Sequence, residues 1–127
     1  MAATGEHEEL SPFCPLFQHA VELIGRRWTG GILRAMLAGA MRFSDIAATI
    51  PGLSDRLLSE RLKELEAEGL IRREVYPDTP VRIEYHLTEK GRALLPAVEE
   101  LAAWAERWLA EEPADAPLER VPAGPRD

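Results

Sequence analysis

The stretch that decides the fold is GLSDRLLSERLKELEAEGLI, residues 52–71. Leu58, Leu62 and Leu65 recur at i, i+4 and i+7, a spacing that places them on one face of a helix. Ser54 is a favourable N-cap before the first turn, and a glycine stands where the helix has to end. The stretch therefore predicts an amphipathic helix whose leucine face is buried and whose opposite face is exposed and available to contact a partner.

Three shorter helices are predicted upstream of this stretch, each ended by glycine or proline. The first begins at Pro15, and the second runs from about Trp28 to Leu37. The third begins near Phe43, with Ser44 expected as its N-cap. The turn PGLS then joins the third helix to the one that carries the leucines, so the two form a predicted helix-turn-helix pair.

Two short runs that alternate apolar and polar residues follow, LIRREVY at 70–76 and VRIEYHL at 81–87. The intervening turn is bounded by prolines, and runs this close in sequence predict a β-hairpin. Thr88 is expected to cap a long final helix, which Pro96 would kink or restart. The predicted fold class is mainly α with a small β-hairpin wing, a winged helix-turn-helix.

The formal charge of −7 is unevenly distributed along the chain. Residues 26–92 hold 12 Lys and Arg against 10 Asp and Glu, a balance of +2, while the two ends hold 3 basic and 12 acidic residues, a balance of −9. Association with a charged partner depends on the local field and not on the total charge. The acidic total therefore does not exclude nucleic acid as a partner of the central region.

The outward face of the decisive helix carries side chains suited to reading DNA. On a wheel of about 100° per residue with Leu58 at zero, the outward positions lie at roughly 100° to 200°. Arg56 is suited to a bidentate contact with guanine, Ser59 and Lys63 to phosphates or base acceptors, and Glu60 to a cytosine amino group. The alternative is a solvated face with i,i+4 charge pairs.

Further basic residues recur on the elements that would face a duplex. Arg82 follows the hairpin turn, where a wing tip reaches a minor groove or backbone phosphates. Arg72 enters the wing, Arg42 precedes the third helix, and Ser54 begins the recognition helix. Each of them alone fits an ordinary surface residue, but their recurrence favours double-stranded DNA as the partner.

Many short motifs in register identify a family. They are CP at 14–15, G-x-x-W-T at 25–29, ILR at 32–34, RF at 42–43, LSERLKELEAEGLI at 58–71, VYP at 75–77, YHLTEKG at 85–91 and Trp104. Over roughly residues 14–108 the chain resembles the HxlR-type branch of MarR-like transcriptional regulators. The resemblance implies a homodimeric winged-helix DNA-binding regulator whose first and last helices build the dimer, and it places the wing arginine of the family on Arg82.

The last helix carries an apolar surface that is too large for a small monomer to leave exposed. With the first helix it gives the predicted dimerisation residues Leu16, Leu101, Trp104, Ala105 and Trp108. The alternative is that this surface folds back on its own core. A dimer would place two recognition helices one helical turn of DNA apart, to read a pseudo-palindromic operator.

Two features suggest how a signal could act. Cys14 precedes Pro15 at a helix N-cap, where the helix dipole favours a thiolate, so it is a candidate redox sensor; the alternative is a small apolar interface residue. Gly30 and Gly31 stand where family members usually carry bulky apolar residues. Beside Trp28 they could open a pocket for a small-molecule effector, or they could allow close helix packing.

The sequence shows no phosphate-binding loop and no nucleophile elbow, and His7, His19 and His86 lack metal-ligand spacing. We therefore expect no enzyme, no metal and no cofactor. A single cysteine and no apolar run of about 18 residues predict a cytoplasmic protein without a membrane span.

The predicted organisation has three parts. Residues 1–11 form a flexible acidic N-terminus, 12–112 a winged helix-turn-helix domain for DNA binding and dimerisation, and 113–127 a disordered tail. The predicted function is a sequence-specific DNA-binding transcriptional regulator, more readily a repressor. The alternative is a winged-helix module that binds proteins and not DNA, since fold does not fix function.

Overall fold

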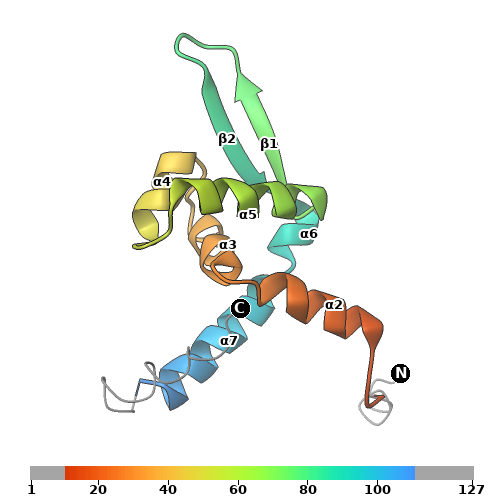
Figure 1. The fold of residues 1–127 in the computed structure, drawn as a ribbon. Coiled ribbons are helices and arrows are strands. Elements are labelled where there is room, and N and C mark those ends of the chain that lie inside the picture. The colour runs from red at the N-terminus through yellow and green to blue at the C-terminus, as the bar shows by residue number, and fades with distance from the viewer. Residues whose placement is uncertain (1–10, 111–127) are drawn as a thin grey trace. The chain divides into compact units, whose positions relative to one another are not determined.

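The computed structural model describes residues 11–110. The predicted flexible N-terminus, apart from Ser11, and the predicted disordered tail lie outside these residues. The chain divides into two compact units, and the boundary falls between Glu64 and Leu65. In chain order the elements are α2 (Pro15–Ile24), α3 (Thr29–Leu37), α4 (Phe43–Thr49), α5 (Asp55–Ala67), β1 (Ile71–Tyr76), β2 (Arg82–Leu87), α6 (Glu89–Arg92) and α7 (Leu95–Trp108) (Figure 1).

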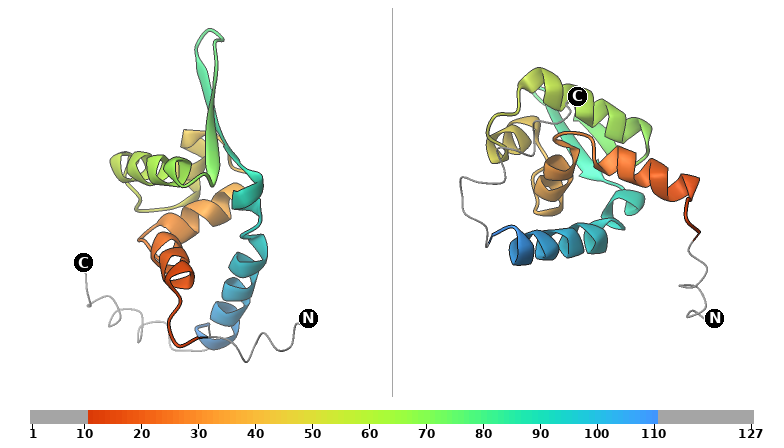
Figure 2. Two further views of the ribbon diagram at one scale, coloured as in Figure 1. Left: turned by 90° about the vertical axis from the view of Figure 1, so that its right-hand side faces the viewer. Right: turned by 60° about the horizontal axis from the view of Figure 1, so that its bottom comes forward.

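The first unit is built around apolar side chains of α3, α4 and α5. α3 packs against both α2 and α4, an arrangement that can be followed in Figure 2. Ile32, Leu33, Ile46 and Leu58 are completely buried, and Leu62, one turn after Leu58, is nearly so. Burying one such side chain contributes about 1.5–3 kcal/mol relative to leaving it in water. The leucine face predicted within residues 52–71 is therefore confirmed as part of the core.

Both ends of α5 follow the predicted signals. The hydroxyl oxygen of Ser54 accepts a hydrogen bond from the backbone N–H of Leu57 at 3.1 Å, which satisfies one donor of the first turn. Two residues beyond the end of the helix, Gly69 has φ +81°, a left-handed conformation that glycine adopts without steric cost. The N-cap and the stop predicted from the sequence are both confirmed.

Two other helix starts differ from the prediction. Ser44 is not the N-cap of α4, because the extended residue before the helix is Arg42 (φ −99°, ψ 152°), whose carbonyl accepts from the Ile46 N–H at 3.0 Å. Trp28 lies before α3 and not within it, with φ +79°. A left-handed backbone costs a residue with a side chain roughly 1–2 kcal/mol, so contacts around Trp28 have to hold it there.

The second unit contains the hairpin. β1 and β2 pair antiparallel, with Tyr76 opposite Arg82 near the turn and Ile71 opposite Leu87 at the other end of the hairpin. Ile71 and Leu87 are buried, as are Leu65 and Leu70, whereas the tip of the hairpin is exposed. The predicted wing is confirmed, and the fold is mainly helical with one two-stranded antiparallel sheet.

The start of the final helical stretch is fixed by Thr88. Its hydroxyl accepts from the Gly91 N–H at 3.1 Å and donates to the Gly69 carbonyl at 2.6 Å. Pro96 restarts the helix, because α6 ends at Arg92 and α7 begins at Leu95. Across residues 11–110 no helix combines the length and the apolar character needed to cross a membrane.

Candidate nucleic-acid interface

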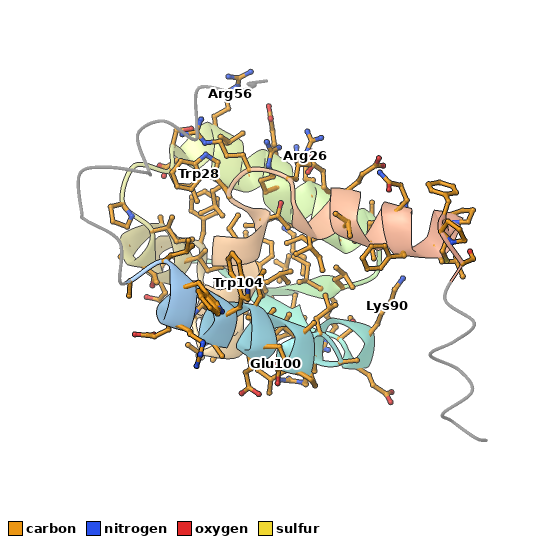
Figure 3. All side chains as sticks on the ribbon, turned by 90° about the horizontal axis from the view of Figure 1, so that it is seen from below. Arg26, Trp28, Arg56, Lys90, Glu100 and Trp104 are labelled. Carbon is orange, nitrogen blue, oxygen red and sulfur yellow. The ribbon has the colours of Figure 1, made fainter. Side chains whose placement is uncertain are left out.

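The outward face of α5 holds the four residues that the wheel places there. The Arg56 side chain is 88% exposed and points away from the ribbon (Figure 3). Glu60 lies one turn later, with its Oε2 3.7 Å from Arg56 Nη2. Lys63 is exposed and Ser59 half-buried. The face thus presents two cations and a hydroxyl with one carboxylate, the composition needed to contact base edges and phosphates.

The start of the helix-turn-helix pair adds two exposed groups. Ser54 is exposed, and because its oxygen acts as the cap acceptor, its hydroxyl proton remains available to a phosphate oxygen. Arg42 is exposed at the N-cap of α4. Both residues belong to the first unit, as do the outward residues of α5.

The arginines predicted for the wing are held by carboxylates of the hairpin. Arg82 Nη1 lies 3.3 Å from Asp78 Oδ2, its Nε lies 3.3 Å from Glu84 Oε2, and the guanidinium sits 4.3 Å from the centroid of the Tyr76 ring. Arg72 Nε donates to Glu74 Oε2 at 2.5 Å. A DNA contact by either arginine would therefore have to compete with an internal partner.

The strand register explains this pairing. Glu74 and Glu84 are directly opposite each other, and like charges at such positions are destabilising unless cations lie between them. Arg72, Arg82 and His86 share that face because residues alternate along a strand. His86 Nε2 lies 2.9 Å from Glu84 Oε1, so this half-buried histidine also belongs to the network between the two strands.

The hydrogen bonds of this face shift the pKa values of two of its groups. The hydroxyl of Tyr76 donates to Glu74 Oε1 at 2.6 Å, and this bond together with that from Arg72 holds the pKa of Glu74 below its ordinary value of 4.5. The same bond raises the pKa of the Tyr76 phenol above its ordinary value of 10.0. The polar face of the wing is therefore a hydrogen-bonded network and not a row of independent charges.

A set of residues around the α2–α3 junction was missed by the sequence analysis. Arg61 is buried, donating from Nε to the Arg27 carbonyl at 2.9 Å and from Nη1 to Glu64 Oε2 at 3.3 Å. Glu64 Oε1 in turn pairs with Arg26 Nε at 3.0 Å. The burial of Arg61 could have been predicted, because the helical wheel places it only about 60° from Leu58, on the buried side of the helix.

The predicted effector pocket would lie between the helices of the first unit. A Cβ built on Gly31 would lie 3.8 Å from Ile50 Cδ1, and one on Gly30 3.9 Å from the Ile24 carbonyl oxygen. Both are ordinary van der Waals distances. This spacing fits close helix packing, the alternative to a pocket, and the pocket itself stays a prediction.

The candidate sensor and the candidate dimer residues are accessible. Cys14 is exposed and stands at the N-cap of α2 in extended backbone. On α2, Leu16 is 81% exposed, and on α7, Leu101 is 62% and Trp104 and Trp108 are each 53% exposed. Ala105 is half-buried. Within the described part of the chain, no group of three or more His, Cys, Asp or Glu residues could hold a metal ion.

A helix-turn-helix pair followed by an antiparallel hairpin defines a winged-helix protein. Residues 23–113 match the family model described as HxlR-like helix-turn-helix, and the chain belongs to this family. It is 52% identical over 99 residues to the HTH-type transcriptional regulator YvaP of Bacillus subtilis (strain 168), covering 78% of this chain and 92% of YvaP.

Solved structures give the same assignment. The reduced form of the transcriptional regulator YodB from B. subtilis is 45% identical with a TM-score of 0.68, covering 76% of this chain and 94% of that one. The redox regulator HypR in its oxidized form is 38% identical with a TM-score of 0.68, and the match covers 74% of this chain and 96% of the HypR chain. The chain is therefore a transcriptional regulator of the HTH type, and the prediction that it is not an enzyme agrees with these relatives.

Proposed function

We propose that the chain acts as a homodimer that binds a pseudo-palindromic operator in double-stranded DNA and represses transcription. The observation that carries this proposal is the exposed face of α5, where Arg56, Ser59 and Lys63 stand opposite the buried Leu58 and Leu62. The first turns of a recognition helix supply the base contacts in this class of fold. Glu60 adds discrimination, since a carboxylate accepts from cytosine and repels a misplaced phosphate.

The remaining predicted contacts position the helix on the backbone. Arg42 and Ser54 are exposed in the same unit as α5 and suit phosphate oxygens. Arg72 and Arg82 serve the wing, where a phosphate oxygen would replace Glu74 or Asp78 as the partner of the guanidinium. Because this exchange trades one ion pair for another, we expect the wing to contribute less affinity than α5.

Dimerisation is supported by the apolar side chains that α2 and α7 leave in water. Leu16, Leu101, Trp104 and Trp108 are each more than half exposed. A second copy of the chain would cover them and, in a two-fold arrangement, would read the second half-site.

The signal that we propose is an oxidant or electrophile acting at Cys14. Solved structures include the diamide-treated and the quinone-bound YodB, and HypR in its oxidized and reduced forms. Cys14 is the single cysteine of this chain. A disulfide would therefore join two Cys14 thiols across a dimer, with their two hydrogens and two electrons passing to diamide, or join Cys14 to a small thiol. A quinone would instead add to the thiolate as a thioether. A small molecule bound beside Trp28, Gly30 and Gly31 is the alternative signal.

The first test is fluorescence anisotropy on the DNA upstream of the gene that encodes this chain, against random duplex of equal length at two salt concentrations. We expect a preference for the upstream DNA that persists at the higher salt. Equal binding that salt weakens on both duplexes would indicate phosphate attraction alone. No binding to either duplex would favour the protein-binding module.

The second test repeats the titration with diamide. Wild-type protein should release the operator, and Cys14→Ser should retain it. Release by the serine variant would contradict the proposed sensor while leaving DNA binding intact.

A further inference from the structure

Three successive residues of the α2–α3 junction, Arg26, Arg27 and Trp28, contact the helix-turn-helix pair. We propose that Arg61 and Glu64 are positioning residues that lock this junction to α5, so that the orientation of the recognition helix is set by α2. The proposal rests on the proposed function, because its consequence is measured in operator recognition. All the residues involved belong to the first unit.

The central link is the buried guanidinium of Arg61. Its side chain is only 9% exposed, although arginine is almost never buried without partners. Nε donates to the Arg27 carbonyl at 2.9 Å, and Nη1 lies 3.3 Å from Glu64 Oε2. The Arg27 carbonyl belongs to the junction, 34 residues earlier in the chain. This hydrogen bond therefore ties α5 directly to the junction that follows α2.

Glu64 forms the second link. Its Oε1 lies 3.0 Å from Arg26 Nε while its Oε2 faces Arg61, so one carboxylate connects two arginines of different elements. The Arg26–Glu64 pair is partly exposed, and such pairs contribute little to stability. The role of the Arg26–Glu64 pair would then be to fix the orientation of the junction relative to α5.

Trp28 forms the third link. Its ring lies beside the turn between α4 and α5, with Cη2 3.6 Å from where a Cβ on Gly52 would stand. Its backbone is left-handed at φ +79°, a strained conformation that persists only where surrounding contacts hold it. Figure 3 shows Arg26 and Trp28 beside the helix that carries Arg56.

These links act at different points of the helix-turn-helix pair: Gly52 in the turn, then Arg61 and Glu64 along α5. Because Arg61 and Glu64 lie one turn apart on α5 and Gly52 lies before its start, the links restrain both the tilt and the rotation of the helix. Base contacts need this rigidity, because donors displaced by about 1 Å no longer match base edges. Contacts with phosphates tolerate more movement, because they depend on charge attraction and not on the arrangement of donors and acceptors on the bases.

The test is the ratio of affinities for operator and random duplex in a set of folded variants. Arg61→Lys keeps the charge but cannot reproduce the planar donor fork. Arg26→Glu breaks the exposed pair and sets two carboxylates against each other, while Arg26→Lys keeps a cation that can still pair with Glu64. Arg92→Glu, at an exposed position of α6, makes the same change of net charge as Arg26→Glu and is the matched control. Circular dichroism and urea unfolding establish that each variant is folded.

We expect Arg61→Lys to weaken operator binding roughly tenfold, the loss of about one charge-assisted hydrogen bond, with random-duplex affinity changed less than about threefold. Arg26→Glu should lower the ratio, whereas Arg26→Lys and Arg92→Glu should leave it unchanged. If Arg61→Lys does not fold, Arg26→Glu and these two controls decide whether the positioning role holds.

Folded variants that keep the wild-type ratio would overturn the positioning role while leaving the proposed function standing. A wild-type protein without preference for any operator would instead overturn the proposed function, and the positioning role would fall with it.

Discussion

Arg56 and Arg61 are five positions apart on one helix, yet the side chain of the first is 88% exposed and that of the second 9%. The helical period separates them, because five residues turn the helix by about 500°, or 140° from the starting direction. The guanidinium of Arg56 thus faces solvent beside Glu60, whereas that of Arg61 is bonded inside the first unit. The proposed function therefore assigns recognition to the first arginine and positioning to the second.

The first prediction concerns Arg56. We expect Arg56→Ala to lose about 1–3 kcal/mol of operator affinity, the discrimination carried by one bidentate contact to guanine. The free energy of unfolding should change by less than about 0.5 kcal/mol, as is usual for exposed sites. Anisotropy and urea unfolding measure the two quantities. Arg92→Ala, which removes an equal charge from an exposed position of α6, is the control. Equal losses in both variants would mean that Arg56 contributes only charge.

The second prediction concerns the pH response of the wing. The Tyr76 hydroxyl is the largest cause of the lowered pKa of Glu74, followed by the bond from Arg72. A carboxyl with a lowered folded-state pKa stabilises the fold above its unfolded pKa, and this contribution is lost as pH falls through the folded pKa. We therefore expect the wing to keep this stabilisation above about pH 4.5 and to lose it in more acid solution.

The variant Tyr76→Phe should move the pKa of Glu74 up towards 4.5. The carboxyl carbon resonance of Glu74, followed by NMR across an acid titration, reports this midpoint. Tyr85→Phe changes a tyrosine on the other face of the hairpin, because residues 76 and 85 occupy register positions of opposite parity. A midpoint that moves in both variants, or in neither, would contradict the assigned cause.

At the scale of elements, regular spacing predicted most of the fold. The leucines at i, i+4 and i+7 predicted α5. Thr88 predicted the start of the last helical stretch, and Pro96 predicted its restart. The missing parts depend on partners that local patterns do not reveal. Arg61 is satisfied by a backbone carbonyl 34 residues away, and the ion pairs of the wing follow from the strand register. Ser44 was wrongly assigned as a cap because residue type alone does not show where the backbone is extended.

The third prediction concerns the packing of α6 in the YHLTEKG motif. A Cβ on Gly91 would overlap the Leu70 carbonyl oxygen and lie 3.1 Å from Leu87 Cδ2. The Leu70 carbonyl also accepts from the Thr88 N–H at 3.0 Å, so it cannot move without breaking a second contact. We expect Gly91→Ala to lower the free energy of unfolding by about 2 kcal/mol or more.

Gly31→Ala, within α3, is the matched glycine control, because its Cβ would lie at an ordinary van der Waals distance from the Ile50 side chain. It should be neutral or stabilising by up to about 1 kcal/mol, the helix propensity difference. Urea unfolding of both variants measures the two changes in the free energy of unfolding. A Gly91→Ala protein as stable as the wild type would show that the approach of α6 to Leu70 is not fixed.

At the scale of the whole molecule, reading a pseudo-palindrome requires two recognition helices and therefore two chains. Each chain has a mass of 14.2 kDa and exposes large apolar side chains on α2 and α7. Large apolar side chains left exposed on a small protein mark interaction sites. If a second copy covered those of each helix, the contacts that stabilise the dimer would also raise its affinity for the operator.

The fourth prediction tests this link at Leu101, which is 62% exposed on α7. Leu101→Glu places a charge where the dimer would exclude water, so light scattering should show one chain of 14.2 kDa where the wild type shows twice that mass. Operator affinity should fall with it, because a single chain contacts one half-site. Ala103→Glu adds the same charge about 200° around the helix, at an exposed position, and should change neither quantity. A monomer that still binds the full operator as tightly as the wild type would separate recognition from pairing, and then α5 would read its site alone.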